Sequence, residues 1–207
     1  MTDIKNNIWF TSDTHYGHKN IVRGTTSWGA FEKGSSHQSV RNFDTLEEHN
    51  ETLIQKFNDL VKPDDILYHL GDWSFGGKEN IQNFRNRLHC KNIHLIFGNH
   101  DQHIEPLSSP YRGCFSSVQY VKQFSIKLDS GKQGFFLSHY SHQVWNQSHH
   151  GVIHLFGHSH GSIKGLGKSM DVGVDTNNLY PYHIDEILER MKDVEPAIVD
   201  HHNGDTN

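Results

Sequence analysis

Residues 7–15, NIWFTSDTH, decide the fold, because an apolar run ends there directly in a polar cluster that contains Asp13 and His15. A short continuous run rich in Ile, Val and Phe is typical of a strand buried on both faces. The same arrangement recurs further along the chain, at residues 66–70, 93–97, 135–137 and 152–156. We therefore predict five buried strands, each followed by polar side chains.

Between these runs, apolar side chains recur at helical spacing in residues 45–61, 78–89 and 183–193. Thr45, with Glu48 three residues later, has the form of a capping box. Residues 118–128 alternate weakly, which predicts an edge strand or a hairpin arm. This order of elements predicts an α/β layered domain.

The polar clusters carry side chains that bind metals. In a layered α/β sheet the carboxyl ends of the strands converge on one edge, where ligands bind. Two side chains separated by one residue in an extended chain point the same way, which applies to the D-x-H and H-x-H pairs. The residues expected to meet at this edge are Asp13, His15, Asp72, Asn99, His139, His158 and His160, with His100 beside them.

This ligand set predicts two ions rather than one. Carboxylate, amide and imidazole ligands suit a divalent first-row ion such as Mn, Fe or Zn better than a thiolate-bound structural zinc. Seven ligands exceed the needs of one tetrahedral ion but suit two ions that share a bridging carboxylate. Such pairs lie ~3.5–4 Å apart and clamp the oxygens of an in-line displacement. Two divalent ions carry more positive charge than two aspartates and a bridging hydroxide neutralise, and the excess would attract an anionic phosphate.

The series D-x-H, G-D, G-N-H-D, H and G-H-S-H, in this order between residues 13 and 160, resembles the motifs of the calcineurin-like metallophosphoesterases. Residues 9–20, 68–75 and 154–161 are similar to the small single-domain branch found in bacteria and their phages. The resemblance implies a four-layer sandwich of two mixed β-sheets flanked by α-helices. We expect one domain over residues 1–200 and a disordered tail over residues 201–207.

The resemblance also implies a role for each motif residue. One metal would be held by Asp13, His15, Asp72 and His160. The other would be held by Asp72, Asn99, His139 and His158, with Asp72 bridging. A hydroxide between the metals would attack phosphorus. His100 would stabilise the transition state and protonate the leaving oxygen, and Asp101 would orient the His100 imidazole by hydrogen bonding. Manganese is the expected ion, with iron, zinc or nickel as alternatives.

Composition excludes several other classes of protein. The chain has 207 residues and a formal net charge of −5, which argues against long duplex nucleic acid as a partner. Cys90 and Cys114 are too few for a disulfide framework, and the first ten residues lack the apolar segment of a signal peptide. No apolar run is long enough to span a membrane. We therefore expect the cytosol of a bacterium or of a phage-infected bacterium, and we leave the oligomeric state open.

Substrate contacts are expected from polar residues near the motifs: His18, Arg23, Arg41 and His150. The alternative for each of them is a role as a surface or structural residue.

The long segments 24–42 and 141–151 are either binding elements or surface loops without a function. Four aromatic residues either stack on a base or anchor the core or a loop: Trp28, Phe43, Trp73 and Trp145. Asp171 and Asp175 are interpreted as structural supports, because they follow the last motif. The chain has 19 histidines, and most of the fourteen outside the motifs are expected to be surface or structural residues.

The resulting hypothesis is a metal-dependent phosphodiesterase that acts on a small nucleotide-type substrate. A phosphomonoesterase of broad specificity is the alternative within the enzymes. A metal-binding interaction module without catalysis is the alternative from another class, although relatives of that kind usually lack ligands that are present here.

Overall fold

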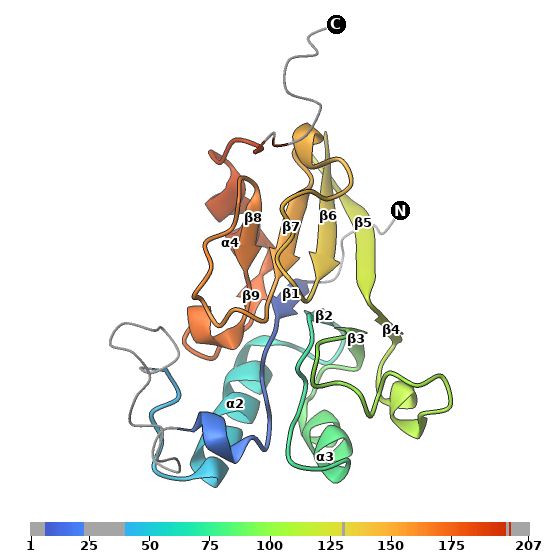
Figure 1. Ribbon diagram of the computed structural model, residues 1–207, viewed down its shortest axis with the longest axis vertical. Helices are drawn as coiled ribbons and strands as arrows, with labels where there is room; N and C mark the ends of the chain where they lie inside the picture. Colours follow the sequence, from blue (N-terminus) through green and yellow to red (C-terminus); the bar gives the residue numbers. More distant parts are fainter. Residues whose placement is uncertain (1–6, 23–39, 130, 198, 200–207) are drawn as a thin grey trace, which may run out of the picture.

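The computed structural model describes residues 7–22, 40–129, 131–197 and 199. In these residues the chain forms two mixed β-sheets and three α-helices (Figure 1). The strands are β1 (Ile8–Thr11), β2 (Ile66–His69), β3 (Asn92–Ile96), β4 (Ser117–Gln119), β5 (Val121–Leu128), β6 (Gly131–Ser138), β7 (Ile153–Phe156), β8 (Ser169–Asp171) and β9 (Tyr182–His183). The helices are α2 (Leu46–Leu60), α3 (Glu79–Arg87) and α4 (Ile184–Met191).

The first sheet has the order β4-β3-β2-β1-β9, and β9 is its antiparallel strand. The second sheet has the order β5-β6-β7-β8, in which β5 pairs antiparallel with β6 and the other pairs are parallel. The five predicted strands are all present, so the expected fold class, two mixed sheets with flanking helices, is confirmed. β1, β2, β3, β6 and β7 each run parallel to a neighbour, which directs their carboxyl ends toward the loops that carry the motifs.

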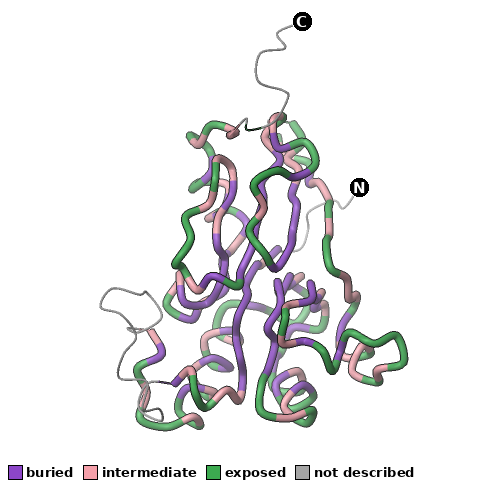
Figure 2. The backbone as a smooth tube through the Cα atoms, in the orientation of Figure 1, coloured by how far each residue is buried: buried purple, intermediate pink, exposed green. Residues whose placement is uncertain are grey.

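Alternating side chains of the first sheet pack on different layers. Leu67 of β2 faces the cluster formed with Phe57 of α2 and Phe84 of α3. Tyr68, the next residue, faces the second sheet and packs in a cluster with Phe135. In Figure 1, α2 and α3 lie on the side of the first sheet that is away from β6 and β7. Figure 2 shows the buried backbone concentrated along the strands between these layers.

The predicted elements differ from the observed ones mainly at their ends. Thr45 caps α2 by accepting a hydrogen bond from the Glu48 backbone N–H (3.1 Å), and the Glu48 carboxylate accepts from the Asp44 N–H instead of that of Thr45. Residues 118–128, expected as one strand, form two. The chain leaves the edge of the first sheet after β4 and enters the edge of the second sheet as β5, so Tyr120 lies between two sheets.

The outer face of the second sheet is covered by the segment that connects β6 with β7. Trp145 of this segment is 5 % exposed and packs with Phe136 and Val152. The expected domain boundary at residue 200 and the tail over residues 201–207 lie outside the described residues.

Candidate metal centre

The loops that follow the strands meet where the two sheets adjoin. The backbone of Ser12, just after β1, bridges to Gly173, just after β8, and so joins the ends of the two sheets. The Asp13 backbone N–H donates to the carbonyl of Gly71 (2.9 Å), which ties the loops after β1 and β2. Carboxyl ends from both sheets therefore deliver side chains to one place, as predicted.

Five of the seven predicted ligand residues have a left-handed backbone. These are Asp13 (φ 57°), His15 (φ 47°), Asp72 (φ 56°), His158 (φ 64°) and His160 (φ 48°). This region is costly for residues other than glycine, and it persists when the surroundings impose it. The backbone at the D-x-H and H-x-H motifs is therefore not extended, and the expectation that both side chains of each pair point the same way fails for H-x-H.

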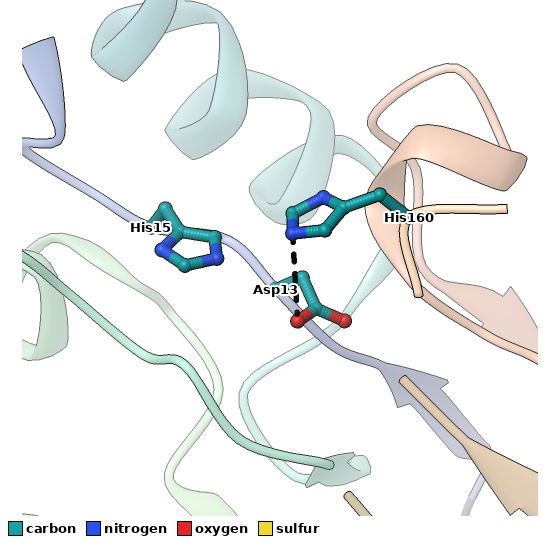
Figure 3. Close-up of side chains that lie close together, drawn as sticks. All are labelled: Asp13, His15 and His160. Atoms are coloured by element: carbon teal, nitrogen blue, oxygen red, sulfur yellow. Dashed lines mark ion pairs between the residues drawn. The ribbon is translucent and has the colours of Figure 1, made fainter. Parts of the chain in front are cut away.

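His158 and His160 belong to two different groups of metal-competent side chains. The first group contains Asp13, His15 and His160, whose ligand atoms all lie within 4.8 Å of one another. Figure 3 shows Asp13 and His15 on the segment after β1 and His160 approaching from the loop after β7, with Nε2 of His160 4.0 Å from Oδ1 of Asp13. The second group contains Asp72, His139 and His158. We name these groups cluster 1 and cluster 2.

Asp72 lies between the two clusters. Its Oδ2 is 3.4 Å from Nε2 of His15 in cluster 1 and 3.7 Å from Nε2 of His139 in cluster 2. Asn99 joins cluster 2, since its Oδ1 is 3.1 Å from the same His139 nitrogen. The seven residues thus gather as two groups around one shared carboxylate, which is the arrangement expected for a two-metal site.

The buried atoms of cluster 1 fit a cation. Oδ1 of Asp13 and both ring nitrogens of His15 are buried and have no hydrogen-bond partner among the described residues. Burial raises the pKa of Asp13 to about 7, and Asp72 adds to this rise, whereas His160 opposes it. Burial, followed by the charges of Arg41 and His160, holds the pKa of His15 well below its usual range, so this imidazole is neutral. A divalent ion would satisfy these lone pairs and stabilise the ionised carboxylate.

Two of the predicted ligand histidines are held in the tautomer that leaves Nε2 free to bind a metal. Nδ1 of His139 lies 2.7 Å from the carbonyl of Leu70, which can only accept, so this nitrogen donates. Nδ1 of His160 donates to the carboxylate of Asp175 at 2.6 Å. A partner of this kind fixes the orientation of the ring and raises its basicity as a ligand.

Arg41 is a correction to the sequence analysis, because it supports cluster 1 and does not face substrate. The guanidinium is fully buried and forms a two-pronged pair with Asp175, through Nε to Oδ1 (2.7 Å) and Nη2 to Oδ2 (2.8 Å). It also donates to the backbone carbonyls of Asp13 and Thr14. Burial opposes the ionisation of Asp175, but Arg41 and His160 outweigh it and hold the pKa of this carboxyl well below its usual range. The buried Asp175 carboxylate therefore orients His160, and the buried Arg41 guanidinium keeps that carboxylate ionised.

Asp171 and Asp175 lie where a supporting role was expected. The Asp171 carboxylate accepts hydrogen bonds from the Ser159 hydroxyl (2.7 Å) and the Gly161 backbone N–H (2.8 Å). These two bonds shape the H-x-H loop, because Ser159 lies between the two ligand histidines.

Asp101 is a second correction. Its carboxylate is buried and accepts from the backbone N–H groups of Asp72 (2.9 Å), Trp73 (3.0 Å) and Gly98 (2.8 Å). The side chain turns back toward the loop after β2, so the structure shows no contact with the His100 imidazole. Asp101 therefore positions Asp72 through its backbone and does not orient His100.

His100 and His18 lie beside cluster 1. The His100 backbone N–H donates to Oδ1 of Asp72 (2.9 Å), and the His100 ring centroid is 5.5 Å from that of His15. The His18 ring lies 5.3 Å from His15 and stacks on Phe75, with centroids 3.9 Å apart. Burial, and then the charge of His100, lowers the pKa of His18 to about 4. His18 thus lies beside the predicted metal ligands, and its contact with substrate stays a prediction.

His150, another predicted substrate contact, does not lie at the clusters. His150 precedes β7, whereas the clusters lie after β6 and β7, so the connecting segment has carried it to the opposite end of the strands. It borders a separate surface cavity with Lys132 and Gln133. Trp73 and Trp145 are buried and anchor the core instead of facing a base. Arg23 and Trp28 lie outside the described residues.

Sequence reasoning missed His69, which links two ligand loops. It is fully buried at the end of β2, with Nε2 2.9 Å from the Thr14 hydroxyl and Nδ1 accepting from the Gly71 N–H (3.3 Å). The available signal was a polar residue inside an apolar run, because a buried polar group needs partners.

Comparison with known proteins agrees with this geometry. The sequence profile of the calcineurin-like phosphoesterases matches residues 7–206. An uncharacterized protein from Methanocaldococcus jannaschii is 29 % identical over 194 residues, covering 89 % of this chain and 91 % of the relative. The gene 66 protein of Mycobacterium phage D29 is 26 % identical over 218 residues, covering 93 % and 99 %. A protein of unknown function from Aquifex aeolicus shares the fold, with a TM-score of 0.59 and 18 % identity over 90 % of this chain and all of the other.

Proposed function

The chain belongs to the calcineurin-like phosphoesterase family, and from this premise we propose that it hydrolyses a phosphodiester of a small nucleotide with two divalent ions bound at clusters 1 and 2. The position of Asp72 carries the proposal, since one carboxylate oxygen lies within 3.4 and 3.7 Å of ligand nitrogens from both clusters. A shared carboxylate of this kind is typical of paired-metal hydrolases.

Each residue of the site has a defined task in this proposal. Asp13, His15 and His160 would hold one ion and Asn99, His139 and His158 the other, with Asp72 between them. Two divalent ions, when bound, lower the pKa of a water molecule and offset the charge of the phosphoryl oxygens. His100, next to cluster 1, would donate a proton to the leaving oxygen. The ligands are nitrogen and oxygen atoms without thiolate, which supports manganese, with iron, zinc or nickel as alternatives.

The charges near the site support a diester over a monoester. The Arg41 guanidinium pairs with Asp175 and is not available to a phosphoryl oxygen. A diester carries one negative charge and a monoester close to two, so the monoester has the greater need for such a cation. The Tyr140 ring is half exposed and lies 4.7 Å from that of His158, where it offers an apolar surface to a second ester group.

The proposed partners and compartment follow from simpler properties. A net charge of −5 supports a small substrate in preference to long duplex nucleic acid. Among the described residues, no helix is long and apolar enough to cross a membrane. Cys90 and Cys114 are both free thiols, which supports a reducing compartment such as the bacterial cytosol.

The test compares two chromogenic esters after the protein has been stripped with a chelator and reloaded with Mn²⁺. We expect bis(4-nitrophenyl) phosphate to be hydrolysed faster than 4-nitrophenyl phosphate, and a panel of nucleotide diesters then narrows the substrate. Asp72→Asn should abolish turnover, whereas His150→Ala, at the opposite end of the strands, should leave it unchanged. Turnover of the monoester alone would show a phosphatase. Metal binding without hydrolysis of either ester would favour an interaction module.

A further inference from the structure

A cavity of about 220 Å³ lies next to His100, outside both metal clusters. Its walls come from two segments: residues 74–81, which lead into α3, and residues 100–104, which follow β3. Ile81 and Ile104, 3 % and 0 % exposed, give it an apolar lining, and the exposed side chains of Gln102 and His103 belong to the same wall. The cavity is smaller than the ~300–1,000 Å³ typical of sites for whole drug-sized ligands, so it suits a single ring.

Phe75 provides this cavity with an aromatic surface. Its ring stacks on His18 at 3.9 Å and meets the His100 ring edge-on at 5.1 Å, with an interplanar angle of 75°. Phe75 nevertheless remains 37 % exposed, which is unusual for a phenylalanine so well packed among other rings. An exposed, immobilised ring beside a reaction site is a stacking surface for a planar group.

The charges around the cavity favour a neutral group. In the part of the chain that the structure describes, no lysine or arginine lines it. Its one acidic residue, Asp101, is buried and its carboxylate already accepts three backbone hydrogen bonds. A second phosphate would therefore find no lysine or arginine among the described lining residues, whereas a nucleobase or a similar ring would find an apolar wall and the polar Gln102 amide.

The position of His100 indicates which part of the substrate enters. In an in-line displacement the nucleophile and the leaving group lie on opposite sides of phosphorus. His100 lies between cluster 1 and the cavity, since its ring contacts both His15 and Phe75. A leaving group that departs from phosphorus toward His100 therefore departs toward the cavity.

We propose that this cavity binds the neutral aromatic ring of the leaving group, as carried by a nucleoside, through stacking on Phe75. This inference rests on the proposed phosphodiesterase function for the direction in which the group leaves. It makes Phe75 a specificity-determining residue for substrates whose leaving group carries a ring.

The first test measures binding without turnover. Adenosine and ribose are titrated into the protein by isothermal calorimetry, and the protein should bind adenosine more tightly. Phe75→Ala should weaken adenosine binding at least about fivefold, the lower end of what base–aromatic stacking supplies. Phe75→Trp should retain binding. Tyr120→Ala, which removes an exposed ring outside the cavity, is the matched control and should change nothing.

The second test separates the cavity from the metal centre. Methyl 4-nitrophenyl phosphate carries its ring on the leaving group, and glycerophosphoethanolamine is a diester without a ring. Phe75→Ala should lower kcat/KM for the first ester at least about fivefold more than for the second.

An equal loss for both esters would mean that Phe75 only supports His18 and His100. The cavity proposal would then be wrong, and the proposed phosphodiesterase function would still stand. Adenosine binding that is insensitive to Phe75→Ala would overturn the proposal too. Absence of all hydrolysis by the wild type would refute the proposed function, and the adenosine titration would still decide the cavity.

Discussion

Asp175→Asn should both destabilise the protein and weaken its metal affinity, because one carboxylate serves two partners. Oδ1 accepts from Nε of Arg41, and Oδ2 accepts from Nη2 of Arg41 and from Nδ1 of His160. An asparagine has a single oxygen, so its amide N–H₂ must face one of these donors. If the amide N–H₂ replaces Oδ2, Nη2 of Arg41 and Nδ1 of His160 both lose their acceptor; if it replaces Oδ1, Nε of Arg41 loses its acceptor. In both orientations the negative charge that holds Arg41 and polarises the His160 ring is gone.

The size of the effect follows from burial. The side chains of Arg41 and Asp175 are 1 % and 0 % exposed. Removing the charge from one member of such a pair typically costs ~3–5 kcal/mol, because the other charge stays buried without compensation. For a domain of this size each kcal/mol lowers Tm by ~2–4 °C, so we expect a decrease of about 6–20 °C. Loss of the partner that orients a ligand histidine typically lowers metal affinity ~10–100-fold.

The assay is thermal unfolding followed by circular dichroism, with and without Mn²⁺. The matched control is Glu51→Gln, which removes the charge from another two-pronged arginine pair. Glu51 and Arg87 are 51 % and 42 % exposed, and pairs of this kind contribute ~0.2–1 kcal/mol. Glu51→Gln should therefore lower Tm by less than about 4 °C and leave the Mn²⁺-induced shift in Tm intact.

Two results would refute the reasoning. If Asp175→Asn lowered Tm no more than Glu51→Gln, the buried pair with Arg41 would not stabilise the fold as argued. If the destabilisation appeared but Mn²⁺ affinity were unchanged, Asp175 would not orient His160 as a ligand.

Three further predictions address other parts of the site. Gly98→Ala should lower Mn²⁺ affinity at least about tenfold by calorimetry, because a Cβ there would lie 2.3 Å from Oδ1 of Asp72 and displace this carboxylate. An unchanged affinity would show that Asp72 does not need its observed position. His100→Ala should lower kcat ~10²–10⁴-fold with Mn²⁺ affinity retained, as expected of a proton donor that is not a ligand; loss of Mn²⁺ binding would contradict that role. The Mn²⁺-induced rise in Tm should be larger at about pH 7.5 than at about pH 5.5. Burial raises the pKa of Asp13 from 3.8 to about 7 in the metal-free fold, which therefore loses stability as pH rises through 7, while the metal needs the ionised form. A rise that is independent of pH would argue against Asp13 as a ligand.

The strands and the ligand inventory were accessible from the sequence because both are local signals. A continuous apolar run such as residues 93–97 indicates a buried strand, and a polar residue after it indicates a position at the sheet edge. The roles of Arg41 and Asp101 were not accessible in this way. Each depends on hydrogen bonds to groups 27 to 134 residues away in the chain, apart from the contact of Arg41 with His49 and the bond between Asp101 and Gly98.

His150 shows the limit of reading a loop by its neighbours in the chain. It is eight residues before His158, a predicted metal ligand, and the sequence analysis placed it near the site for this reason. The strand β7 lies between the two histidines, so His150 and His158 lie at opposite ends of this strand.

The sequence by itself determined the five buried strands that precede the motifs, the three helices, and which side chains are chemically able to hold two metals. Tertiary structure alone decided which of those side chains belong to cluster 1 and which to cluster 2. His158 and His160 are two residues apart, yet left-handed φ angles at both positions send them to different clusters. Those angles are imposed from outside the loop. The His158 N–H donates to the Asp13 carboxylate, and the His160 ring is held by Asp175. Periodicity reports the local backbone, whereas the geometry of this centre comes from contacts between loops that only the folded chain brings together.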